Sequence, residues 1–361
     1  MTISRGRLSD NVKALKKRLR GKARLLAVVK ADAYGHGMAV EADIALKNGA
    51  DALAVALVDE AIALREAKIS APILVLGGTT CPSAIDAAVE NHITLSLYDA
   101  RTLEMMNEFA VRRDTVAHAH LKIDTGMRRV GLVGMDELDG MLDSLSECPR
   151  VKCEGVFTHF ADDRDDEYTS YQNDLFKLAV KRVRDRGYRV IAHASASGAT
   201  VKNSELWHDM VRPGIALYGG SVRDIMPELM PAQRLAAKPV RIERVGAGES
   251  VSYGRTFTAN EESVIATLPI GYGDGYPRAL SNRAQVLVKG QRANVAGRVC
   301  MDMLMVDVTG IQGVSMDDEF VLMGWQGADM ITPDELAERA GTISYEIMLG
   351  FKDRIPRIYV D

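Results

Sequence analysis

Short apolar segments alternate with amphipathic segments along the first two-thirds of the chain. Eight apolar runs of strand length are separated, for the most part, by stretches with the period of a helix that buries one face. Strands that alternate with helices favour parallel pairing, and eight such units in about 220 residues have the number and size of a (β/α)8 TIM barrel. An open doubly wound sheet would also fit the pattern. The predicted strands are residues 25–29, 52–56, 73–76, 93–97, 116–123, 151–157, 190–192 and 209–211, and the clearest helices are 39–47, 82–89, 100–111 and 171–184.

The pattern changes after about residue 235, where short alternating strands and glycine turns replace the helical periods. This pattern of short strands and glycine turns is typical of a mostly antiparallel β domain. The stretch 227–231, rich in proline and methionine, is the expected boundary, so we predict a barrel over residues 1–230 and a β domain over residues 231–361. The strands expected in the second domain are 239–245, 263–268, 285–289, 293–296, 303–308 and 319–323, and the helices are 333–340 and 345–349.

Composition narrows the classes of function. The 361-residue chain has a formal net charge of −4, so no basic field for nucleic acid is expected. The histidines and the four cysteines lack the close spacing of metal ligands, and we expect no metal site. No apolar run approaches the roughly 20 residues that span a bilayer, and no signal-peptide core is evident. We therefore expect a soluble, cytoplasmic protein without a membrane partner.

Polar and basic residues follow the predicted strands, whereas the strand bodies are expected to be apolar. In a (β/α)8 barrel, catalytic groups gather at the carboxyl ends of the strands. A rim rich in basic residues favours a ligand with negative charge, such as a phosphate. The side chains expected at this rim include Lys30, Lys122, Arg129, His159, Ser197 and Arg212.

Lys30 is the most informative of these residues, because it directly follows the apolar run that ends at Val29. Partial desolvation lowers the pKa of an amine and makes it a nucleophile toward an aldehyde. A lysine whose amine reaches out to solvent at the rim is the alternative. The glycines that follow Tyr34 would let the backbone approach a cofactor closely. Ser197, with the backbone N–H groups of Gly214 and Ile215, resembles a phosphate cradle.

Taken together, these motifs resemble those of the bacterial alanine racemases, which are pyridoxal-phosphate enzymes of fold type III. The resemblance covers nearly the whole chain, and the motifs occur in the family's order. The matching segments are AVVKADAYGHG (27–37), KIDTGMRRVG (122–131), THF (158–160), VRPGIALYG (211–219), VSYGRTF (251–257), PIGYGDG (269–275), GRVCMD (297–302) and ISYE (343–346).

The resemblance implies pyridoxal 5'-phosphate as cofactor. Lys30 matches the lysine that holds it as a Schiff base, and Arg212 matches the arginine on its pyridine nitrogen. Lys122 matches a lysine that is often carbamylated, which would invert its charge beside Arg129. The other positions that match cofactor-binding residues are Tyr34, His159, Ser197, Gly214, Ile215 and Tyr345.

The resemblance also implies a homodimer whose active site has two catalytic bases. Lys30 would serve the face of the D-isomer, and Tyr253, contributed by the partner chain, the face of the L-isomer. An ordinary tyrosine is a poor base, so His159 and the cationic surroundings would stabilise its anion. The substrate-binding positions are Arg129, Met301 from the partner chain, and Tyr272 at the narrow entrance.

The implied function is the interconversion of L-alanine and D-alanine, which supplies D-alanine for peptidoglycan. Tyr345 favours alanine, because some serine-preferring relatives carry a smaller polar residue there, but a racemase of serine or of small amino acids in general stays an alternative. A pyridoxal-phosphate decarboxylase would be longer and would use a cysteine where this chain has Tyr253, and a non-catalytic carrier would resemble the barrel alone. Ala196 replaces the family's usual asparagine, so cofactor affinity or substrate choice is expected to differ.

Overall fold

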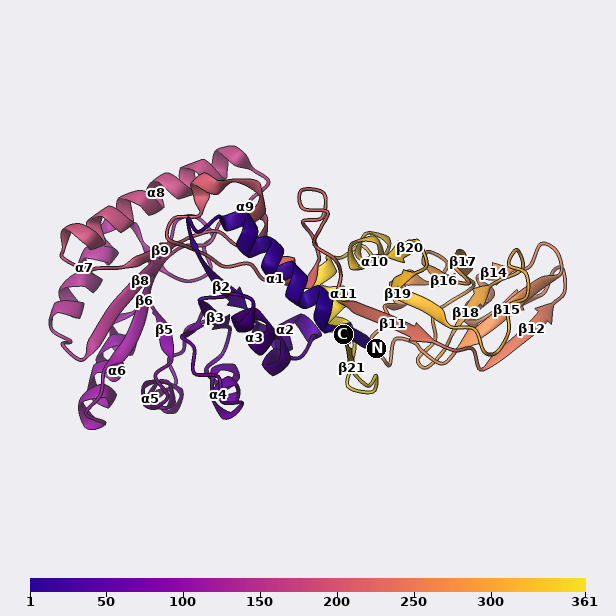
Figure 1. Cartoon of the computed structure of the whole chain (residues 1–361), viewed down its shortest axis with the longest axis horizontal. Helices are drawn as coiled ribbons and strands as arrows, with labels where there is room; N and C mark the ends of the chain where they lie inside the picture. The colour runs from indigo at the N-terminus through magenta and orange to yellow at the C-terminus, as the bar shows by residue number, and fades with distance from the viewer.

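The computed structural model describes all residues from 1 to 361 and has an elongated shape, with a barrel at one end and a β-rich region at the other (Figure 1). Each part has its own hydrophobic core. The larger core fills the barrel and the layer between its strands and helices, and a smaller core lies inside the β-rich region.

The barrel is a closed sheet of eight parallel strands. Each strand pairs with its neighbours, and the pairing of β5 with β6 closes the ring. The predicted TIM barrel is thereby confirmed, and the open doubly wound sheet is wrong, because an open sheet would leave those two strands unpaired. All eight predicted strands are present, as β2 (Arg24–Val28), β3 (Ala52–Val55), β4 (Ile73–Val75), β5 (Thr94–Leu97), β6 (Ala117–Asp124), β8 (Val151–Phe157), β9 (Ile191–His193) and β10 (Met210–Val211).

Helices cover the outside of the barrel, and each main helix turns an apolar face toward the strands. The longest is α8, whose buried positions recur with helical spacing. The helices are α1 (Arg5–Leu19), α2 (Lys30–Gly35), α3 (Met38–Lys47), α4 (Val58–Glu66), α5 (Pro82–Glu90), α6 (Ala100–Arg112), α7 (Gly134–Ser146), α8 (Asp166–Asp185) and α9 (Ser197–Lys202), with a short strand β7 (Leu132–Val133) and the 3-10 turns η1 (Ser204–Leu206) and η2 (Ile215–Tyr218).

The second region is a largely antiparallel sheet, as predicted. Its strand order is β12-β15-β18-β17-β16-β19-β11-β1-β21, with β20 beside β19, and a separate ribbon joins β13 to β14. Its elements are β11 (Gln233–Ala237), β12 (Arg241–Val245), β13 (Ser250–Val251), η3 (Tyr253–Arg255), β14 (Phe257–Thr258), β15 (Ser263–Leu268), η4 (Arg278–Leu280), β16 (Gln285–Val288), β17 (Gln291–Val295), β18 (Leu304–Asp307), β19 (Phe320–Gln326), β20 (Asp329–Ile331), α10 (Pro333–Ala340), α11 (Ser344–Gly350) and β21 (Ile358–Val360).

The first residues of the chain belong to this second sheet. Strand β1 (Thr2–Ser4) runs parallel to β21 and antiparallel to β11, so the two chain ends lie side by side (Figure 1). No helix or strand occurs between η2 and β11, where the boundary was expected. None of the helices combines the length and apolar composition needed to cross a membrane.

Candidate active site

A cavity of about 540 Å³ lies at the carboxyl ends of the barrel strands. This volume is within the usual range for small-molecule sites. The cavity gathers side chains from widely separated parts of the sequence. The predicted site residues that line it are Lys30, Tyr34, Lys122, Arg129, His159, Ser197, Arg212, Gly214, Ile215 and Tyr345.

Lys30 begins a turn of unusual backbone conformation. The four residues from Ala31 to Tyr34 all have φ between 51° and 55°, which makes this a left-handed turn built without glycine. L-residues avoid this conformation, at a cost of roughly 1–2 kcal/mol each, so surrounding contacts must hold it. The Ala31 N–H donates to Oε1 of Glu60 at 2.6 Å, and the Met38 N–H donates to Oδ1 of Asp32 at 2.8 Å.

The β-rich region also braces this turn. The side chains of Gln233 and Arg357 each donate to the Gly35 carbonyl at 3.1 Å, and the Tyr359 hydroxyl donates to the His36 carbonyl at 3.1 Å. The position of Lys30 therefore depends on both parts of the chain.

The surroundings of Lys30 favour its neutral amine. Burial lowers the pKa of Lys30, and the nearby Arg129 guanidinium lowers it further, whereas the Glu60 carboxylate has a smaller opposing effect. A neutral amine is the form that attacks an aldehyde and accepts a proton.

Beside Lys30 the cavity offers a set of hydrogen-bond donors suited to a phosphate group. Ser197 Oγ accepts from the backbone N–H groups of Gly214, at 2.9 Å, and Ala216, at 3.2 Å, which leaves the hydroxyl hydrogen of Ser197 to donate into the cavity. A side chain at Gly214 would collide with the Tyr34 hydroxyl, so glycine is needed for the close approach. The Ile215 N–H opens η2 and has no acceptor within that turn. These groups fit the phosphate of pyridoxal phosphate.

Arg212 lies at the centre of a buried hydrogen-bond network and is only 2% exposed. Its Nη2 donates to the carbonyls of Thr158, at 2.7 Å, and Ala194, at 2.8 Å, and its Nη1 donates to His193 Nδ1 at 2.8 Å. Burial lowers the pKa of Arg212 to about 9, so the guanidinium keeps its charge at neutral pH. Burial, and then Arg212, lower the pKa values of His159 and His193, which therefore stay neutral.

The expectation of apolar strand bodies is wrong for β6, because this strand carries buried basic side chains. Lys122 is 3% exposed, its Nζ donates to the Ile123 carbonyl at 3.2 Å, and burial followed by Arg212 lowers its pKa to about 7. His120 Nδ1 lies 2.8 Å from His193 Nε2 inside the barrel. The basic residues 118, 120 and 122 occur at every second position, which is the sequence signature of one strand face.

Three predicted site residues lie elsewhere, on the β-rich region. Tyr253, Tyr272 and Met301 are 71%, 38% and 54% exposed, and none of them lines the Lys30 cavity. The neighbouring strand β14 is far from the barrel in Figure 1. Within one chain, the predicted residues therefore form two separate groups.

The second group is itself held together by the backbone around Cys300. Ser252 Oγ donates to the Arg298 carbonyl at 2.6 Å, which anchors the turn that carries Tyr253. The Tyr272 N–H donates to the Cys300 carbonyl at 3.0 Å, and the Gly273 N–H donates to the Met301 carbonyl at 2.7 Å. Tyr253, Tyr272 and Met301 thus belong to one exposed cluster of loops.

Two positioning residues were not predicted. Glu60 links the Lys30 turn to the start of α4, and its only sequence signature is its place in the first turn of a helix. His193 ends β9, at the rim where polar residues follow the strands, but no motif gave it a role. No group of three or more His, Cys, Asp or Glu side chains is arranged to hold a metal ion.

Comparison with protein families gives two matches that together span nearly the whole chain. The model described as alanine racemase, N-terminal domain, matches residues 3–222, and the model described as alanine racemase, C-terminal domain, matches residues 232–359. A match to both regions does not support a carrier that resembles the barrel alone.

Individual relatives agree with this assignment. The chain is 41% identical to alanine racemase 2 of Caldanaerobacter subterraneus subsp. tengcongensis, over 97% of this chain and 92% of the relative. It is 42% identical to alanine racemase 1 of Oceanobacillus iheyensis, over 99% and 97%.

Solved structures give the same result. Alanine racemase from Streptomyces coelicolor A3(2) superposes with a TM-score of 0.94 at 34% identity, covering 100% of this chain and 97% of that one. Alanine racemase from Bacillus anthracis with bound L-Ala-P superposes with a TM-score of 0.90 at 36% identity, covering 100% and 94%. With matched domains, matched length and a matched fold, the chain belongs to the alanine racemase family.

Proposed function

We propose that this protein interconverts L-alanine and D-alanine with pyridoxal 5'-phosphate, and that its active unit is a homodimer. The observation that most strongly supports the proposal is that Lys30 and the phosphate cradle line the same cavity. A lysine with a lowered pKa beside such a cradle suits an aldehyde that bears a phosphate group.

Different residues of this cavity would bind different parts of the cofactor. Lys30 would hold its aldehyde carbon, and Arg212 would donate a hydrogen bond to its pyridine nitrogen. The phosphate would lie among Tyr34, Ser197, Gly214, Ile215 and Tyr345. Bound in this way, the cofactor would supply an electron sink that stabilises negative charge on the α-carbon of the amino acid.

Racemisation requires a proton to leave one face of the α-carbon and another to reach the opposite face. The Lys30 amine serves the face of the D-isomer, and Arg129, which lowers its pKa, also offers a positive charge to the substrate carboxylate. Tyr253 serves the face of the L-isomer. Arg212 keeps its own proton as a hydrogen-bond donor, so the pyridine nitrogen that it faces would stay unprotonated, which disfavours side reactions such as transamination.

His159 is suited to stabilise the Tyr253 anion. Arg212 Nη2 lies 3.4 Å from His159 Nδ1, while its two hydrogens go to the nearer carbonyls of Thr158 and Ala194. The positive charge of Arg212 beside Nδ1 favours the tautomer of this neutral histidine that carries its proton on Nε2. An Nε2–H donor stabilises a phenolate, and it makes tyrosine a usable base near neutral pH.

The position of Tyr253 supports the proposed homodimer. In one chain this tyrosine lies outside the Lys30 cavity, so another chain has to supply it. The exposed loops that carry Tyr253, Tyr272 and Met301 have the aromatic and methionine content typical of an interface.

Alanine is the proposed substrate because the relatives are alanine racemases, and the Bacillus anthracis structure contains L-Ala-P. Serine is the second candidate. The test is to incubate the purified protein with added cofactor and a panel of L-amino acids, and to measure loss of optical rotation. Fast loss with L-alanine and slower loss with L-serine is expected, and carbon dioxide release in place of racemisation would contradict the proposal.

A Lys30→Ala variant tests the role of the lysine. It should lose both the activity and the visible absorbance of the bound cofactor. Lys47→Ala, which removes an exposed lysine of α3, is the matched control and should retain both. An unchanged spectrum in Lys30→Ala would overturn the assignment.

A further inference from the structure

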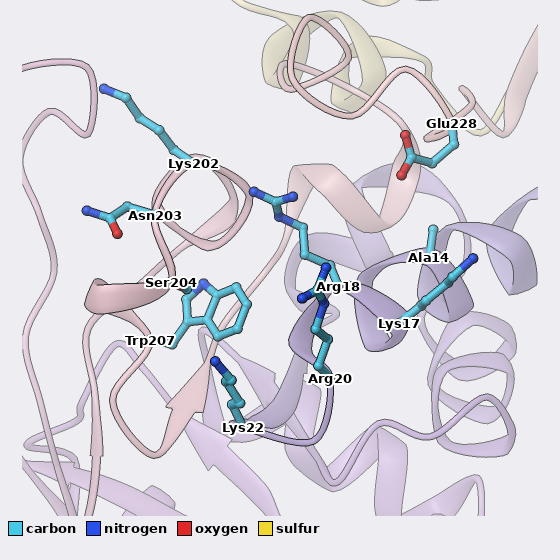
Figure 2. Close-up of a pocket in the computed structure, with 10 residues that line it drawn as sticks. All are labelled: Ala14, Lys17, Arg18, Arg20, Lys22, Lys202, Asn203, Ser204, Trp207 and Glu228. Carbon is cyan, nitrogen blue, oxygen red and sulfur yellow. The ribbon is translucent and has the colours of Figure 1, made fainter.

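A second hollow, of about 710 Å³, lies between the end of α1 and the segment that leads from α9 into β10 (Figure 2). All of its lining residues except Glu228 precede β2 or β10, which are neighbours in the barrel, so it lies at the amino ends of these strands. Lys30 follows the opposite end of β2, and five strand residues of about 3.3 Å each separate the two sites. We call this hollow the basic pocket. It is lined by Ala14, Lys17, Arg18, Arg20, Lys22, Lys202, Asn203, Ser204, Trp207 and Glu228.

The charge of the basic pocket is strongly positive in a chain whose formal net charge is −4. Lys202 pairs with Asp166, but the other four cationic side chains make no ion pair, and Glu228 is the only acid in the lining. Gathering unpaired like charges is unfavourable, and an anion would relieve the repulsion.

Stabilisation of helix α1 explains the presence of only some of these basic residues. Basic residues in the last turn of α1, including Lys17 and Arg18, offset the helix dipole. Arg20 and Lys22, however, lie beyond the last helical residue, Leu19, and their charges gain little from the dipole.

Part of the lining is held in place. Arg18 donates from Nη2 to the Val201 carbonyl, which fixes its guanidinium between α1 and α9, and its buried Nε has no partner. The Trp207 indole N–H donates to the Thr200 carbonyl at 2.8 Å, and its largely buried ring forms a wall. As drawn in Figure 2, the side chains of Arg18, Arg20 and Lys22 gather around this ring.

Arg20 occupies a position that suits glycine better. It caps α1 with φ 49° and ψ 31°, in the left-handed region, and Gly21 follows with φ 72°. Helices usually place glycine or asparagine at such a position. A long cationic side chain at a strained helix cap points to a functional role for its positive charge.

We propose that the basic pocket binds a small molecule that carries a diphosphate group. Guanidinium groups bind phosphate oxygens in pairs, and the lysine amines add point charges around them. The volume is sufficient for a diphosphate with an attached organic group. This site is separate from the cofactor cavity and does not depend on the racemase activity.

The test titrates the cofactor-loaded protein with inorganic pyrophosphate by isothermal calorimetry, so that the cradle at Ser197 is already filled. One binding event per chain is expected. The variant Arg20→Gly with Lys22→Gln should weaken binding at least ten-fold while the melting temperature stays equal or rises, because glycine relieves the strained cap. Its racemase activity should be unchanged.

The matched control is Lys13→Gln with Lys47→Gln, which removes two exposed lysines on α1 and α3 outside the pocket. It should bind pyrophosphate like the unaltered protein. A parallel titration with ADP identifies the source of the diphosphate: tighter binding than pyrophosphate assigns a nucleotide, and binding of pyrophosphate alone assigns the free anion. Absence of pyrophosphate binding at millimolar concentration, or equal weakening in both double variants, would overturn the proposal.

Discussion

The guanidinium of Arg212 donates to Nδ1 of His193 across 2.8 Å, and this contact determines where protons lie inside the barrel. Because Arg212 can only donate, His193 must carry its proton on Nε2. That nitrogen lies 2.8 Å from His120 Nδ1, which must then accept. The chain of donors thus runs in one direction, away from Arg212, and keeps its guanidinium oriented.

Removing His193 should therefore disturb the cofactor without emptying the site. In His193→Leu a buried charged donor loses its acceptor, which costs about 1–3 kcal/mol, and we expect kcat to fall by roughly ten-fold or more with a shift in the visible spectrum. His193→Gln keeps an acceptor oxygen and should retain more of both. Identical kcat and spectrum in the leucine variant would show that the contact does not position Arg212.

Tyr253→Phe should slow proton exchange from L-alanine but not from D-alanine. Loss of a general base costs about 10²–10⁴-fold, so exchange of the α-proton with solvent deuterium should slow by this factor when the reaction starts from L-alanine. Exchange that starts from D-alanine should persist, since Lys30 serves that face. The measurement is single-turnover exchange followed by mass spectrometry, with the exposed Tyr171→Phe of α8 as control. Equal slowing from both isomers would argue against two bases.

Lys122 should react with carbon dioxide. Its pKa of about 7 leaves a large fraction of neutral amine at pH 8, and Arg129 and Arg212 lie close enough to lower that pKa and to favour a negative carbamate. In ¹³CO₂-equilibrated protein, a ¹³C carbamate resonance is expected at pH 8 and should be lost as the pH falls below 7. Lys122→Ala should lack the resonance. Its presence in that variant would assign the carbamate to another amine.

Histidines that are buried or half-buried should make stability depend on pH. Burial lowers the pKa values of His36, His120 and His208 to about 4, whereas unfolding returns them to about 6.5. Between these values the unfolded chain binds more protons, so stability is lost as the pH falls from 6.5 toward 4.

At pH 5, each of these histidines should add about one proton to the uptake on unfolding. His208→Gln keeps a donor toward Asn173 and should reduce the uptake by about one. The slope of unfolding free energy against pH, from denaturant titrations, measures this uptake. A slope unchanged by the substitution would contradict the assignment.

The barrel could be predicted because its strands are short apolar runs, each followed by an amphipathic helix. Each predicted barrel strand lies within one residue of its observed ends. Strand β1 could not be predicted, because three residues carry no measurable period and its partners, β11 and β21, lie far away in the sequence.

The site was only partly predictable, for physical reasons. The left-handed turn from Ala31 to Tyr34 consists of residues that rarely adopt that conformation, and it exists only because distant contacts such as that of Gln233 hold it. The donor chain through His193 likewise depends on side chains from three strands meeting inside the barrel. Sequence motifs identify chemical groups, whereas tertiary contacts decide their orientation.

The central claim is that Lys30 of one chain works with Tyr253 of its partner, and mixing two inactive variants tests it most directly. Lys30→Ala and Tyr253→Phe are each purified, mixed, unfolded and refolded together with cofactor. In a random mixture half of the dimers are hybrids, and each hybrid has one intact site of two. The account predicts recovery of roughly a quarter of the unaltered activity. No recovery in a mixture that forms hybrid dimers would place both residues in the same chain's site and contradict the account.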